Sequence, residues 1–274
     1  MTRSPLRLAG TSLEPLLFWK RDHSIAEAVD FASSTAATMA RLGSGAFVAH
    51  IGKRPAKLFE LYDREGCPLC RKVREALSIL DLNAIVHPCP AGGTRFSGRV
   101  VERAGKMILP LLVDPNGQAE VQLTDSDAIV RHLFSRYGDG KVPLALRAGA
   151  LTDRTSEVAS LLRRSKGQHA LASKMPDQLL ELFSYEASPY CRIVREMLSQ
   201  LELPYVLHNV ARGSPKRAAF IERAGKMQVP YLVDEVHGVA MFESRAIVTY
   251  LEDRYRDVGD TGLDPGRPGP IPLQ

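Results

Sequence analysis

Residues 102–107 read ERAGKM, and the same six residues occur again, unchanged, at 222–227. Each copy leads to a proline, Pro110 or Pro230, and the next four residues are LLVD in the first case and YLVD in the second. An identical hexapeptide that recurs after about 120 residues, with matching sequence beyond it, indicates an internal duplication. The fold of the chain is therefore the fold of one unit present twice.

The match extends in both directions from the hexapeptide. Three further pairs of segments correspond: LFELY at 58–62 with LELFSY at 180–185, CPLCR at 67–71 with SPYCR at 188–192, and DSDAIV at 125–130 with ESRAIV at 243–248. The two copies differ at one chemically important point, because the first has a Cys-x-x-Cys sequence where the second has Ser-x-x-Cys.

Each repeat is predicted to begin with a strand, at 58–62 or 181–185. A helix follows with a proline in its first turn, where a missing amide is tolerated, and with Cys67 or Ser188 near its N-cap. Apolar residues at spacings of three and four give this helix a predicted buried face, which comprises Leu69, Val73, Ala76, Leu77 and Leu80 in the first repeat and Ile193, Val194, Met197, Leu198 and Leu201 in the second.

The remainder of each repeat is predicted from the same kinds of signal. It contains a strand at 84–87 or 205–208, a short helix that ends at Gly105 or Gly225, a hairpin of two antiparallel strands, and a last helix that starts at Ser126 or Ser244. The order βαβαββα predicts an α/β fold in which a sheet carries helices on both faces.

Amphipathic segments at 24–42 and 152–164 predict an extra helix before each repeat, residues 165–178 have the composition of a linker, and the Gly- and Pro-rich residues 259–274 that of a disordered tail. The predicted organisation is an N-terminal helical extension (1–57), a first domain (58–138), a helical linker (139–179), a second domain (180–257) and a disordered tail (258–274).

Composition restricts the classes of protein to consider. The chain has 274 residues, 45% hydrophobic and 24% charged, and its net charge of +5 arises from 36 basic and 31 acidic residues spread along it. We therefore expect a folded protein that binds no nucleic acid. Four cysteines are too few for a disulfide scaffold, and no apolar window is long enough for a membrane span, so we expect a cytoplasmic protein without membrane contact.

The CPLC sequence at 67–70 has a chemical rationale. A helix N-terminus presents free amides and a positive partial charge to the first sulfur, which favours the thiolate of Cys67. Arg64, Arg71 and Arg74 are placed to add positive potential. Cys70 is then the resolving thiol or a half-buried helix residue. In the second repeat, the hydroxyl of Ser188 is more readily explained as an N-cap than as a catalyst.

Residues 62–70, the Leu109-Pro110 step and the Asp125-Ser126 pair resemble glutaredoxins and the N-terminal domain of glutathione transferases, which share the thioredoxin fold. The resemblance covers residues 58–137 and 180–255. It implies two tandem thioredoxin-like domains of the βαβαββα type, each with a cis proline next to the cysteine position. It also implies glutathione sites, in which the residue before the proline pairs with the cysteinyl backbone of glutathione and the acidic-Ser pair holds its γ-glutamyl end. The residues implied are Leu109, Pro110, Asp125 and Ser126 in the first repeat and Val229, Pro230, Glu243 and Ser244 in the second.

From this resemblance we expect a glutathione-dependent thiol-disulfide oxidoreductase. Cys67 attacks a disulfide or glutathionylated substrate, glutathione is a cosubstrate, and no metal is needed. The first alternative is a non-catalytic glutathione-binding or scaffold protein. A conjugating transferase that uses Ser188 is the less favoured alternative, because neither repeat is followed by the helical domain that completes such enzymes.

A zinc site formed by Cys67, Cys70, His87 and Cys89 and a shared iron-sulfur cluster on Cys67 are weaker interpretations of the same thiols. The oligomeric state and the arrangement of the two domains are left open.

Overall fold

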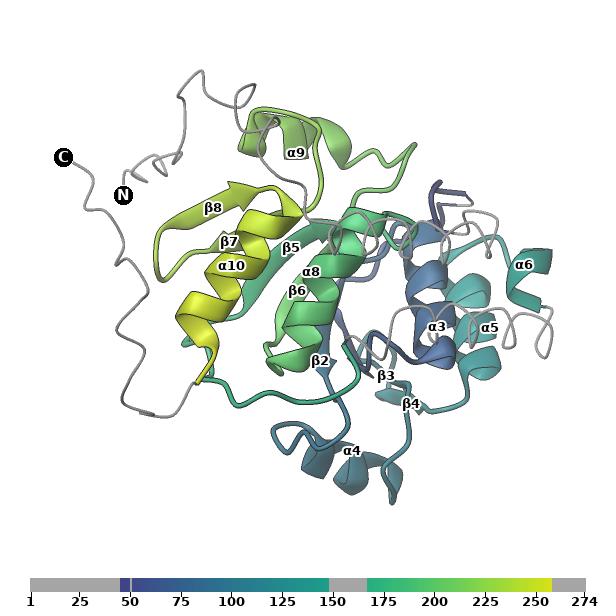
Figure 1. Cartoon of the computed structure of the whole chain (residues 1–274). Coiled ribbons are helices and arrows are strands. Elements are labelled where there is room, and N and C mark those ends of the chain that lie inside the picture. The colour runs from purple at the N-terminus through teal and green to yellow at the C-terminus, as the bar shows by residue number, and fades with distance from the viewer. Residues whose placement is uncertain (1–44, 50, 148–166, 258–274) are drawn as a thin grey trace, which may run out of the picture.

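The computed structural model describes residues 45–49, 51–147 and 167–257 (Figure 1). We call residues 45–147 the first half and residues 167–257 the second half. The helices expected at 24–42 and 152–164 and the tail expected from 258 lie outside the described residues. Within the expected N-terminal extension, residues 45–49 and 51–57 contain no helix.

The element order βαβαββα is present twice, as the sequence predicted. The first half comprises β1 (Phe59–Asp63), α3 (Pro68–Ile79), β2 (Ala84–Pro88), α4 (Ser97–Ala104), β3 (Leu111–Asp114), β4 (Val121–Leu123) and α5 (Ser126–Tyr137), followed by the short α6 (Leu144–Arg147). The second half comprises β5 (Leu180–Ser184), α8 (Pro189–Gln200), β6 (Tyr205–Asn209), α9 (Arg217–Ala224), β7 (Tyr231–Asp234), β8 (Val239–Phe242) and α10 (Ser244–Tyr255).

Local signals fixed most boundaries of these elements. Pro68 and Pro189 occupy the first turn of α3 and α8. Gly105 and Gly225 end α4 and α9 in the left-handed conformation that glycine adopts without strain, with φ of 74° and 82°. The predicted helix starts and C-caps are therefore confirmed.

Apolar side chains fill both faces of the sheet. On β1, Phe59 and Leu61 pack beneath α3 and α5, whereas Tyr62 points to the opposite face and packs with Val100 of α4. This alternation is the period of two that a strand imposes. The second half repeats the arrangement, with one core under α8 and α10 and another under α9. Each half is thus a layer of sheet between helices (Figure 1).

The two halves share one sheet, which the sequence did not predict. Its strand order is β4-β3-β1-β2-β6-β5-β7-β8, and the halves join where β2 pairs antiparallel with β6. The register places Ala84 opposite Leu207 and Val86 opposite Tyr205. This pairing satisfies the backbone of two strands that would otherwise be exposed edges.

Each half also contributes the segment before its first strand to the other half. Residues 46–48 exchange backbone hydrogen bonds with Arg212 of the second half, and residues 168–170 exchange them with Ala91 of the first. Within the segment expected as a linker, residues 168–170 therefore pack on the first half. We call residues 167–170 the second arm.

The predicted buried face of the CPLC helix is only partly correct. Val73, Ala76, Leu77 and Leu80 are fully buried, but Leu69 is 39% exposed. The other face of α3 and α8 is not solvated either, since Arg71, Arg74, Arg192 and Arg195 are buried between the halves. Helical periodicity alone cannot reveal a charged face that is covered by a second domain.

Candidate functional site

Cys67 lies at the N-cap of α3, directly after the loop that leaves β1. Its sulfur accepts a hydrogen bond from the backbone amide of Cys70 at 3.4 Å. All four cysteines are unpaired, and Cys67 is the one that is partly exposed, while Cys70, Cys89 and Cys191 are buried. A reagent in solution therefore meets Cys67 first.

The surroundings of Cys67 favour its thiolate. The hydrogen bond from Cys70, the amides of Cys70 and Leu69 and the charge of Arg64 together outweigh burial and lower the pKa of Cys67 to about 6. Burial and the neighbouring Cys67 instead raise the pKa of Cys70. The two thiols are therefore differentiated, with an ionised outer sulfur and a protonated inner one at neutral pH.

A cis proline lies beside the start of the loop that leads from β1 to Cys67, and another beside the start of the loop that leads from β5 to Ser188. The peptide bonds Leu109-Pro110 and Val229-Pro230 are both cis, as the resemblance implied. Because β3 pairs antiparallel with β1 and Leu111 lies opposite Tyr62, Pro110 adjoins the end of β1 that leads to Cys67. The pairing of Tyr231 with Phe183 gives Pro230 the same place in the second half.

The start of α5 lies near the CPLC helix. Asp125 is the N-cap, and its carboxylate accepts a hydrogen bond from the amide of Ala128 at 2.7 Å, while Ser126 is buried. An ion pair between Lys72 of α3 and Asp127 of α5 connects the two helices. The start of α5 therefore lies beside Lys72 of α3, the helix that Cys67 caps.

The equivalent positions of the second half are built differently. Ser188 is 3% exposed and caps α8, accepting from the amide of Cys191 at 3.3 Å. Burial raises the pKa of Cys191. Glu243 has a positive φ of 69° and makes no capping bond to α10; it accepts instead from Gln228, next to Val229-Pro230, and Ser244 begins the helix. The described second half therefore has no accessible thiol.

Two other residues named from the sequence lie apart from this arrangement. Cys89 is buried, and its Sγ contacts the carbonyl of His87 at 3.5 Å. The His87 ring stacks on Tyr62, and burial lowers its pKa to about 4. Within the described ranges, no three His, Cys, Asp or Glu side chains are grouped to hold a metal ion.

Sequence reasoning placed three arginines near Cys67, and the structure separates their roles. The charge of Arg64 contributes to the lowered pKa of Cys67. Arg71 and Arg74 instead pair with Glu186 of the second half. No signal in the sequence identified Glu65, Glu186 and Arg195, since a contact between the halves cannot be read from either repeat alone.

A comparison with protein-family models matches the glutathione S-transferase N-terminal domain at residues 61–141 and 182–259, together more than half of the chain. The chain belongs to this family. It is a tandem member, with two thioredoxin-like domains of the glutathione S-transferase N-terminal kind, and the family relates it to glutathione.

Two other comparisons add little to the family assignment. Among solved structures, Leishmania TDR1, described as a unique trimeric glutathione transferase, matches with 12% identity and a TM-score of 0.25, covering 71% of this chain and 68% of its own. A search of curated proteins found no match. None of the helices in the described ranges has the length and apolarity that crossing a membrane requires.

Proposed function

We propose that the protein is a glutathione-dependent thiol-disulfide oxidoreductase whose nucleophile is Cys67. The observation that carries the proposal is the contrast between the two thiols of the CPLC sequence: Cys67 is partly exposed with a pKa lowered to about 6, and Cys70 is buried with a raised pKa. Thiol-disulfide exchange requires an accessible thiolate, which Cys67 supplies, and a protonated second thiol such as Cys70 leaves that attack to Cys67.

The proposed reaction begins when the Cys67 thiolate attacks the glutathione sulfur of a glutathionylated substrate. A disulfide forms between Cys67 and glutathione, and the substrate leaves as a thiolate that takes up a proton. A second glutathione, as its thiolate, then attacks the glutathione sulfur of this mixed disulfide. Cys67 is released as the thiolate and glutathione disulfide leaves. In the dithiol route, Cys70 loses its proton and attacks the Cys67 sulfur of the mixed disulfide, and glutathione leaves as a thiolate that takes up a proton. Two further glutathione molecules then reduce the Cys67–Cys70 disulfide and leave as glutathione disulfide.

Glutathione is proposed to bind along the edge formed by the cis-proline turn and the start of α5. The backbone of Leu109, before Pro110, pairs with its cysteinyl part. Asp125 and Ser126, at a helix N-terminus suited to a carboxylate, hold the γ-glutamyl end. Val229, Pro230, Glu243 and Ser244 are proposed to form a second glutathione site, which serves binding because Ser188 and Cys191 are buried.

The test is reduction of a small mixed disulfide by glutathione in an assay coupled to glutathione reductase. We expect Cys67→Ser to abolish turnover. Retained turnover in Cys70→Ser would indicate that glutathione resolves the mixed disulfide, and Ser188→Ala is the matched control because it changes the equivalent residue of the second half. Full activity in Cys67→Ser would refute the proposal.

A non-catalytic glutathione-binding protein is the second candidate, favoured by the buried Ser188 and Cys191 of the second half. It predicts glutathione binding by calorimetry without turnover and with an ordinary Cys67 pKa near 8.5. A conjugating transferase is disfavoured, because the Ser188 hydroxyl is buried and caps α8; it requires turnover of a chlorinated aromatic electrophile that Ser188→Ala removes. The four unpaired cysteines suit a reducing compartment, and we propose a cytoplasmic protein.

A further inference from the structure

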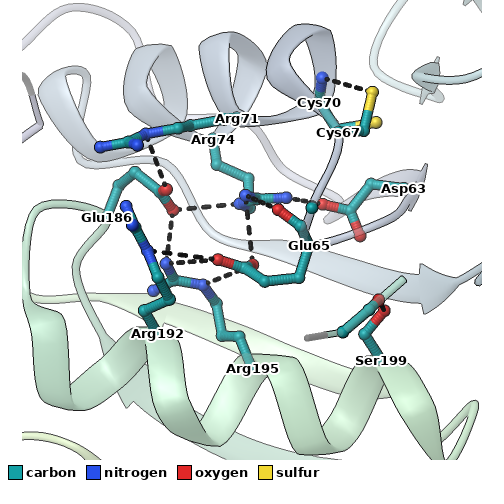
Figure 2. A network of polar contacts seen from close by, with 12 residues as sticks. Asp63, Glu65, Cys67, Cys70, Arg71, Arg74, Glu186, Arg192, Arg195 and Ser199 are labelled. Carbon is teal, nitrogen blue, oxygen red and sulfur yellow. Dashed lines mark hydrogen bonds and ion pairs between the residues drawn. The ribbon is translucent and has the colours of Figure 1, made fainter. Parts of the chain in front are cut away.

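A network of buried charges fills the space between the CPLC helix and its counterpart in the second half. Figure 2 shows the arginines of α3 and α8 pointing toward one another, with Glu65 and Glu186 between them. Arg74 and Arg195 are each 1% exposed at the side chain, and the two glutamates are 5% and 2% exposed. Charges this deeply buried need partners, and each of these has several.

The first-half loop that leads to Cys67 is held by both central arginines. Arg195 donates from Nε to Glu65 Oε2 at 3.0 Å and from Nη2 to Glu65 Oε1 at 3.1 Å. Arg74 pairs with Asp63, and its Nη2 reaches the backbone carbonyl of Glu65 at 3.3 Å. Of these two arginines, Arg195 belongs to the second half.

Glu186 closes the network from the second half. Its Oε2 lies 3.0 Å from Arg74 Nε and 3.0 Å from Arg195 Nη2, so each arginine contacts a glutamate of both halves. Burial opposes ionisation of Glu186, but Arg195 and Arg74 outweigh it and lower its pKa to about 2. Glu186 is therefore ionised at neutral pH, and the network, which uses glutamates and arginines of both halves, cannot be divided between them.

The second arm contacts the same loop. Gln168 Nε2 lies 3.5 Å from the carbonyl of Gly66, and a Cβ on Gly66 would lie 2.3 Å from Gln168 Cγ. A Cβ on Gly167 would lie 3.1 Å from Glu65 Cβ. The last two residues before Cys67 are thus both in close contact with the second half.

We propose that the second half is part of the Cys67 site, with Arg195 and Gln168 as positioning residues that fix the loop from which Cys67 projects. The inference rests on the function proposed for Cys67 and adds a role for the second half in that function. Arg195 and Gln168 act through Glu65 and Gly66 and do not touch the sulfur.

The physical link between loop and sulfur is the N-cap of α3. Cys67 accepts the bond from Cys70 because its backbone is held extended, with φ −85° and ψ 123°. A loop that moves at Glu65 and Gly66 moves this sulfur away from the amides of the first turn. The other groups in the described residues that bear on its charge are Arg64 and Cys70, and Cys70 in turn responds to Asp63 and Arg74.

The experiment measures alkylation of Cys67 by iodoacetamide as a function of pH, with the modified residue identified by fragment-ion mass spectrometry. Arg195→Lys keeps the buried charge but loses the two-point contact with Glu65. Gln168→Ala is a milder change in a partly exposed residue. The matched control is Arg223→Lys, which alters a two-point contact with Glu181 on the outer side of the second half.

We expect Arg195→Lys and Gln168→Ala each to raise the Cys67 pKa by about half a unit or more, a threefold change in proton affinity, and Arg223→Lys to leave it at the wild-type value. If the network served only to join the halves, these substitutions would lower the stability of the protein and leave the Cys67 pKa unchanged. If a folded variant shows the wild-type pH dependence of Cys67 alkylation, the positioning role of the substituted residue is refuted. If Arg195→Lys does not fold, the result for Gln168→Ala alone tests the proposal. Alkylation is measured without turnover, so an inactive wild type refutes the proposed oxidoreductase without affecting this result.

Discussion

The contact between Gly66 and Gln168 predicts that Gly66→Ala changes the stability of the protein in opposite directions, depending on whether residue 168 is glutamine or alanine. A methyl group on Gly66 would lie 2.3 Å from Cγ, 2.6 Å from Nε2 and 2.8 Å from Cδ of Gln168. The Gln168 backbone cannot retreat easily, because its carbonyl accepts the amide of Ala91. Gly66→Ala therefore forces the Gln168 side chain into another rotamer or displaces the loop, and we expect destabilisation of about 1–3 kcal/mol.

A Gln168→Ala protein lacks Cγ, Cδ and Nε2 of residue 168, the three atoms that lie nearest to the added methyl group. Gly66 does not have a positive φ, so alanine is compatible with its backbone. Replacing glycine by alanine at such a position stabilises by about 0.4–1 kcal/mol, because the unfolded chain loses conformational freedom. We therefore expect Gly66→Ala to destabilise the wild type and to stabilise the Gln168→Ala variant.

Urea unfolding of wild type, both single variants and the double variant measures the coupling between the two positions. The difference between the two effects of Gly66→Ala is expected to exceed about 1 kcal/mol, beyond the error of additive sites. Equal effects in both backgrounds would show that Gln168 does not lie against Gly66, and the placement of the second arm would then be wrong.

Three further outcomes are expected. In the native protein, iodoacetamide modification of Cys67 is half-maximal near pH 6, because its pKa is about 6, and peptide mapping finds Cys191 protected; half-maximal reaction near pH 8.5 contradicts the lowered pKa. Hydrogen bonds from His132 and Tyr137 hold the pKa of Asp114 low against burial, so the Asp114 carboxylate stabilises the fold above its unfolded pKa and loses that contribution as pH falls through the lower folded value. We therefore expect Tyr137→Phe to lower the free energy of unfolding in urea by about 1.5–3 kcal/mol at pH 7 and by less near pH 3. A loss of stability that is as large in acid would contradict this linkage. Arg95 of the first half donates hydrogen bonds to the second-half carbonyls of Leu201, Glu202 and Ser173. We expect Arg95→Ala to lower the free energy of unfolding by about 1–3 kcal/mol and the control Arg99→Ala to change it by less than about 0.5 kcal/mol. Equal effects of the two substitutions would argue against this contact between the halves.

The parts of the fold that the sequence predicted are those with local causes. Pro68 in a first helical turn, Gly105 at a C-cap and Ser126 at a helix start each report their conformation within a few residues. The duplication then doubled the evidence, because each signal occurs at matching positions in both repeats. The cis state of Pro110 and Pro230 was predicted through the resemblance, since sequence near a proline does not specify its isomer.

The parts that the sequence did not predict depend on what covers a surface. The sign-alternating charges from Arg71 to Glu75 are typical of a solvated helix face, yet Arg71, Arg74 and Glu75 are buried, because α8 and the loop at Glu186 lie over them. The pairing of β2 with β6 is equally invisible, since a strand with two neighbours and a strand at an edge have the same alternation. Each of these features requires knowing that the two repeats meet.

The two halves differ where they meet around the cysteine position. Cys67 is replaced by Ser188, Gly66 by Ala187 and Asp63 by Ser184, and the arm residue equivalent to Gln168 is Ala46. In the first half a residue without a side chain faces a long one, and the strand ends in a carboxylate that pairs with Arg74; in the second half both positions carry alanine, and the serine hydroxyl accepts from Arg195 at 3.3 Å. The asymmetry of the thiols is thus accompanied by an asymmetry of the contacts that hold each loop. If each site depended on its own repeat alone, the two arms would have no physical reason to carry different residues, Gln168 and Ala46, against the two loops. The Cys67 pKa in Gln168→Ala is therefore the measurement that distinguishes one composite site from two independent domains.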